Sequence, residues 1–160
     1  MLKVIGLSLI ITGAFGTALW NVRFQKQRLK INEAMLDIIL YVRNRIMFFH
    51  EDLNDIYQSY ENDVLQKCGF LCELSEGDFI YALNKSRIKD SFDDRTGAAL
   101  WEFGKKLGKS GIDEQISNCD YCIEVLEKRI ACLQEEIPKK SKTYSSLCII
   151  AGLAAVLLLI

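Results

Sequence analysis

The sequence predicts an all-α protein: an antiparallel helical bundle in which two long heptad helices are capped by short helices and flanked by N- and C-terminal membrane segments. Three observations lead to this architecture. Two long stretches carry apolar residues at heptad spacing, apolar runs occupy both ends, and a single proline occurs in 160 residues. We expect a membrane segment at 1–21, a helical bundle at 22–140 and a second membrane segment at 144–160.

The stretch 112–137 has the more regular heptad pattern. Its apolar positions alternate in steps of four and three, as in a helix packed lengthwise against another helix. At about 1.5 Å per residue this helix would be about 39 Å long, so it needs a partner of similar length. Pro138 is expected to end it. The stripe consists of Ile112, Ile116, Cys119, Ile123, Leu126, Ile130, Leu133 and Ile137.

The first residues are typical of a membrane anchor. Residues 4–20 would give about 26 Å of helix, close to the roughly 30 Å of a bilayer's hydrocarbon core. The positive charges of Arg23 and Lys26 follow the apolar run, which favours retention on the cytoplasmic side. A cleaved signal peptide is the alternative, because small residues at 14–18 have a cleavable spacing. The protein would then be an exported helical adhesin released after signal cleavage.

A second heptad stripe follows the anchor without a turn signal and runs to Phe49. It matches 112–137 in length, and both helices would be tethered to one membrane face. We therefore expect the two helices to run antiparallel as a two-helix stalk. The predicted stalk-packing residues are Ile31, Met35, Ile38, Val42, Ile116, Ile123, Leu126, Ile130 and Leu133.

Short helices are expected between the two long ones, at the far end of the stalk. One is predicted over 53–65 and is stopped by Gly69. The segment 75–78 matches a capping box that opens a second helix. A third helix follows the charged connector 90–95 and ends at Gly108.

The C-terminal tail is apolar from Leu147 onwards and follows a basic cluster. It would make about 21 Å of helix, shorter than the bilayer core, so a half-inserted tail is an alternative to a spanning one. Both ends carry their positive charge on the side of the middle region, which predicts a cytoplasmic helical domain with both termini outside. The predicted membrane-interface residues are Trp20, Arg23, Lys26, Lys139, Lys140, Lys142 and Tyr144.

No catalytic, cofactor or metal site is predicted, and we expect no enzymatic activity. The segment 105–110 lacks the first glycine of a phosphate-binding loop and follows a helix rather than a strand. His50 is the only histidine, which excludes a histidine-based triad. The net charge is −1 and the acids lie in the middle of the chain, which argues against nucleic-acid binding.

Six cysteines leave one alternative function open. Cys119 and Cys122 lie one helical turn apart on the predicted stalk, which favours core packing over a disulfide framework. Together with Cys68 and Cys72 they supply enough thiols for a zinc site in principle. The alternative to a scaffold is therefore a cysteine-based redox- or metal-responsive membrane regulatory protein.

Several stretches resemble the stage III sporulation protein AB family, and together they cover essentially the whole chain. They are Met1-Leu2-Lys3-Val4-Ile5-Gly6, Phe103-Gly104-Lys105-Lys106-Leu107-Gly108 followed by Asp113-Glu114-Gln115-Ile116, and Lys142-Thr143-Tyr144 leading into Ala151-Gly152-Leu153-Ala154. The segment 103–108 is the most specific, although Phe103 replaces its usual first leucine. A second departure is at 50–53, where the family's proline-containing turn is expected.

The resemblance implies a component of the sporulation channel between mother cell and forespore. The family's helical domain is similar to the cytoplasmic domain of the inner-membrane platform proteins of type II secretion and type IV pilus machines. It implies a membrane-anchored scaffold in the mother-cell membrane around the forespore. Its implied partners are the lipid bilayer, a stage III sporulation AA-type ATPase docked on the helical domain and other channel components. The sequence leaves open whether the chain forms a homo-oligomer.

Overall fold

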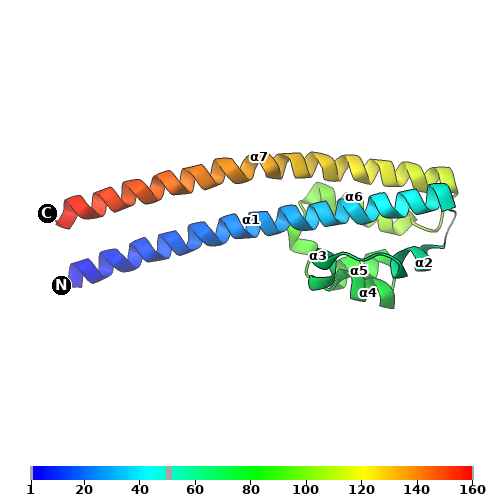
Figure 1. Cartoon of the computed structure of the whole chain (residues 1–160), viewed down its shortest axis with the longest axis horizontal. Helices are drawn as coiled ribbons and strands as arrows, with labels where there is room; N and C mark the ends of the chain where they lie inside the picture. The colour runs from blue at the N-terminus through cyan, green and yellow to red at the C-terminus, as the bar shows by residue number, and fades with distance from the viewer. Residues whose placement is uncertain (1, 50–51, 160) are drawn as a thin grey trace. The chain divides into compact units, whose positions relative to one another are not determined.

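The computed structural model describes residues 2–49 and 52–159, with side chains described chiefly between Trp20 and Lys140. The described residues are all-helical and contain no strand, which confirms the predicted fold class at this level. The elements are α1 (Leu2–Phe49), α2 (Leu53–Gln58), α3 (Asp63–Lys67), α4 (Phe70–Glu76), α5 (Phe79–Lys85), the 3-10 turn η1 (Lys89–Ser91), α6 (Asp94–Lys106) and α7 (Ile112–Leu159) (Figure 1).

The chain divides into two compact units. One unit comprises Met1–Gln27 and Cys132–Ile160, and the other comprises Arg28–Ala131. The second, called the helical unit below, contains all the short helices together with the adjoining stretches of α1 and α7.

The two long helices are each continuous over 48 residues. This agrees with the expected run from the anchor into the first stalk helix. It corrects the expectation that Pro138 ends the last helix, because α7 passes through this residue. A proline removes one backbone hydrogen bond and crowds the preceding turn. Ion pairs four residues apart on either side of it, Glu135–Lys139 at 3.4 Å and Glu136–Lys140 at 2.9 Å, favour the helical geometry there.

The first predicted short helix is in fact two helices. α2 ends at Gln58, and α3 begins after Asn62, whose side-chain oxygen accepts hydrogen bonds from the backbone N–H groups of Val64 and Leu65 at 3.0 and 3.2 Å. Asparagine is a strong N-cap because it satisfies amides that have no partner within the helix. The cap therefore starts a new helix where the apolar spacing alone suggested one element.

The region around Gly69 and 75–78 also differs from the prediction. Gly69 does follow a helix end, that of α3, but with φ +79° it is also the N-cap of α4, a helix that was not predicted. Ser75 lies inside α4 rather than at a helix start. Asp78 is the cap of α5, where its carboxylate accepts the Tyr81 N–H at 2.7 Å.

Within the helical unit, α1 and α7 run antiparallel with α6 beside them (Figure 1). Arg43 of α1 pairs with Asp120 of α7 at 2.6 Å. At the first residue of α1 in this unit, Arg28 donates a hydrogen bond to the Ser91 carbonyl at 3.1 Å. Two residues after Ser91, the Asp93 carboxylate lies 3.7 Å from Arg129 of α7. The short helices thus pack along α1 and α7. This corrects the expectation that they cap a bare two-helix stalk at its far end.

Candidate interaction site

The predicted stalk-packing residues are mostly buried. Ile31, Met35, Ile38, Val42, Leu126, Ile130 and Leu133 are at most 8% exposed, while Ile116 and Ile123 are half-buried. Ile38 and Leu126 belong to one apolar core, and Ile116 and Ile123 pack against it. The core also contains Cys122 and Val125, which lie beside the predicted stripe. The heptad pattern missed them because it describes contact with one neighbour, whereas α7 in the helical unit is covered by more than one.

The predicted membrane-interface residues lie at the surface where their side chains are described. Trp20 is 73% exposed, and Arg23, Lys26, Lys139, Lys140 and Lys142 are exposed; the side chain of Tyr144 lies outside the described residues. Near these residues, α1 and α7 together line a small cavity of about 80 Å³ that includes Gln25 and Ile137.

The two predicted membrane segments fall mainly on residues whose side chains are not described. In the part of the chain that the structure describes, no helix is both long and apolar enough to cross a bilayer. The membrane segments at 1–21 and 144–160 therefore stay predictions.

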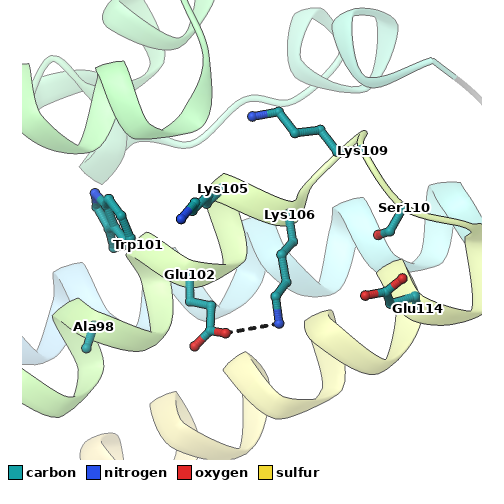
Figure 2. A pocket seen from close by; sticks show the side chains of 8 residues that line it. All are labelled: Ala98, Trp101, Glu102, Lys105, Lys106, Lys109, Ser110 and Glu114. Atoms are coloured by element: carbon teal, nitrogen blue, oxygen red, sulfur yellow. Dashed lines mark ion pairs between the residues drawn. The ribbon is translucent and has the colours of Figure 1, made fainter.

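A surface hollow lies between the end of α6 and the start of α7 (Figure 2). It has a volume of about 660 Å³. We call it the Trp101 groove and define it by Ala98, Trp101, Glu102, Lys105, Lys106, Lys109, Ser110 and Glu114.

One exposed aromatic ring and three lysines dominate the groove. The Trp101 side chain is 47% exposed, and the Lys105 ammonium lies 5.2 Å from the centre of its ring. Glu102 pairs with Lys106 at 3.0 Å, drawn as the dashed line in Figure 2. The hydrogen bond that the Lys106 ammonium donates to Glu102 raises the pKa of Lys106, so this lysine is cationic at any physiological pH.

The groove follows from the amphipathic sequence of α6 and from the turn after it. Leu100, Phe103 and Leu107 point into the core, which leaves Trp101 and Lys105 on the outer face of the helix. Gly108 has φ +74°, a conformation that glycine adopts without strain.

The Gln115 side chain holds the loop that closes the groove. It accepts the Gly108 N–H at 3.3 Å and donates to the Ser110 carbonyl at 2.8 Å. Sequence reasoning identified 103–108 as the most family-specific segment but did not anticipate a groove. The residues that line the groove belong to two helices and the loop between them, and the sequence pattern alone does not show that they lie side by side.

The cysteines are in environments that suppress thiolate chemistry where they are buried. Burial raises the pKa of Cys119 and of Cys122 to about 12, and it raises the pKa of the half-buried Cys68 thiol as well. Among the described residues, no cluster of three or more histidine, cysteine or acidic side chains could hold a metal ion. His50 lies outside the described residues.

A family model described as stage III sporulation protein AB matches residues 3–160. No curated protein and no solved structure matches the chain.

Proposed function

The chain belongs to the stage III sporulation protein AB family and is thus a sporulation-stage protein; from this we propose that it is a non-enzymatic scaffold of the channel apparatus between mother cell and forespore. Its two ends hold it in the mother-cell membrane, with both termini outside. Its helical unit lies in the cytoplasm and docks a stage III sporulation AA-type ATPase.

One feature of the helical unit carries this proposal. α1 enters the unit near Arg28 and α7 leaves it near Arg129, and both residues interact with the short segment 91–93. The two connections to the rest of the chain are therefore at the same end of the unit. This arrangement suits a domain that is tethered from one side and presents its other surfaces to a partner in solution.

The packing of the unit supports a mechanical role. Its core runs without interruption from α1 through the short helices to α7 and includes Phe70, Phe79 and Phe103 as fully or almost fully buried rings. Close packing of this kind transmits displacement because interiors have low compressibility. A stiff unit would couple the position of a docked ATPase to the membrane.

Co-purification tests the docking role. The full-length chain, solubilised from membranes of sporulating cells, should retain the AA-type ATPase through washing. The absence of the ATPase from such a preparation, when a tagged unrelated membrane protein from the same cells serves as background, would refute the proposal.

A helix-breaking insertion tests the mechanical part. A glycine inserted at Leu126, which is fully buried in α7, should abolish spore formation while the protein stays membrane-bound. The matched control is a glycine inserted after Glu61, in the exposed link between α2 and α3, which should leave sporulation intact. Normal sporulation with the first insertion would contradict mechanical coupling.

Accessibility tests the orientation. Cys72 is exposed in the helical unit. A thiol reagent that does not cross membranes should leave it unlabelled in intact cells and label it after lysis. Labelling in intact cells would place the unit outside and remove the basis for ATPase docking.

A further inference from the structure

We propose that the Trp101 groove is the docking site for an acidic segment of the ATPase, with an apolar side chain of that segment seated against Trp101. This inference rests on the proposed function and adds to it the residues and the chemistry of contact.

The charge of the groove favours an anionic occupant. Lys106 is neutralised by Glu102 at 3.0 Å. Within the described residues, Lys105 and Lys109 have no ion-pair partner, so two ammonium groups remain available at the rim. Uncompensated charges of this kind steer an oppositely charged partner and set its orientation.

Trp101 supplies the apolar part of the contact. A tryptophan that is 47% exposed leaves much of a large apolar surface in water, at a free-energy cost that its own fold does not require. Tryptophan is enriched among the residues that dominate protein–protein binding energies, because it buries a large area at little cost in conformational entropy. The neighbouring Ala98 is small and leaves the ring accessible from its side.

The charges that line the groove also distinguish a protein segment from a lipid surface as its occupant. Glu102 and Glu114 lie among the lysines (Figure 2). A dense layer of anionic headgroups would meet these carboxylates as well as the lysines. A folded partner can place its acidic groups at Lys105 and Lys109 only, so the mixed charge pattern favours a protein occupant.

Charge reversal tests the proposal in the full-length chain held in detergent micelles. The affinity for the purified ATPase is measured by titration at low and high salt. The double variant Lys105→Glu/Lys109→Glu should bind about tenfold more weakly or worse at low salt, and added salt should weaken wild-type binding more than binding by the variant. The neutral variant Lys105→Ala/Lys109→Ala should fall between the two.

The matched control reverses the same number of charges elsewhere on the helical unit. Lys67 and Lys89 are exposed lysines outside the groove. The variant Lys67→Glu/Lys89→Glu should bind the ATPase within about twofold of wild type. Circular dichroism of each variant verifies that the helices are retained.

Each remaining outcome contradicts the groove. Wild-type binding with no loss in either groove variant would overturn the docking site and leave the scaffold function standing. Equal losses in groove and control variants would mean a non-specific charge effect. Failure of the wild type to bind would remove both proposals. Binding to vesicles that contain phosphatidylglycerol tests the membrane alternative. If the groove variants bound the ATPase as the wild type does but bound these vesicles more weakly, the groove would face a membrane and the inference would be wrong.

Discussion

The two faces of α6 have different surroundings, although both are formed by the same 13 residues. The inner face carries Leu100 and Phe103, which are fully buried, whereas the outer face carries Trp101 and Lys105, which are exposed. The inner face is fixed by contacts with α5 and with the core, whereas on the outer face the structure shows the Glu102–Lys106 pair and the Lys105–Trp101 contact. Stability and recognition are therefore assigned to different side chains of one helix, and substitutions should affect them separately.

The largest effect should come from removing the aromatic ring at the centre of the inner face. Phe103 stacks edge-on against Phe79 with ring centres 5.0 Å apart, and Phe79 contacts Phe70 in the same way at 5.5 Å. Phe103→Ala leaves a cavity and should lower the free energy of unfolding by about 3–5 kcal/mol. Urea unfolding of the full-length chain, followed by circular dichroism, measures it. A loss below about 1 kcal/mol would mean that this face is not tightly packed.

Substituting alanine at two glycines of α6 should change the free energy of unfolding in opposite directions. A Cβ at Gly104 would lie 2.8 Å from the Phe79 ring and 3.0 Å from Ile80, whereas a Cβ at Gly97 has no atom within 4 Å. Phe79 is held between two other rings and has little freedom to move away. Gly104→Ala should therefore destabilise the chain by about 1–2 kcal/mol despite the gain in helix propensity.

Gly97→Ala is the matched control for that substitution. It gains helix propensity without a clash and should stabilise the chain by about 0.5–1 kcal/mol. Paired unfolding curves give both values. Equal shifts in the two variants would show that packing does not distinguish the faces.

The start of α6 gives a smaller, pH-dependent effect. Burial alone would raise the pKa of Asp93, but its hydrogen bonds with Thr96 and the charge of Arg129 outweigh burial, and the net pKa is lowered. The carboxylate caps α6 by accepting the Thr96 N–H at 3.1 Å. Asp93→Ala should cost about 1 kcal/mol near neutral pH.

The sign of the pH dependence follows from the lowered pKa. The stabilisation from Asp93 is complete above its ordinary pKa of 3.8 and is lost as the pH falls through the lower value of the folded state. The difference in unfolding free energy between wild type and Asp93→Ala should therefore shrink below about pH 4. A difference that grew on acidification would contradict this assignment.

The long helices and α6 could be predicted because their signals are local and repeated. Heptad spacing located Ile38 and Leu126 in the core, and Gly108 was correctly expected to end a helix. The short helices were harder, since a single cap such as Asn62 decides whether one helix or two is formed, and Gly69 serves both as a stop and as a start.

Tertiary contacts account for the rest of the differences. α7 continues through Pro138 although a local rule predicts a break, and Val125 is buried in the core although it lies outside the heptad stripe. The Trp101 groove combines side chains from α6, the following loop and α7, so its lysines and its tryptophan gain their meaning only when these segments meet.

The separation of stability from recognition on α6 is tested most directly by Trp101→Ala, with unfolding and ATPase binding measured on the same preparation. Since the ring is 47% exposed and alanine favours helix, the free energy of unfolding should change by no more than about 0.5 kcal/mol. Binding of the ATPase should weaken by about 30-fold, as expected for an aromatic residue at the centre of an interface. A destabilised chain that binds the ATPase as tightly as wild type would contradict the account, because Trp101 would then belong to the packing and not to the contact.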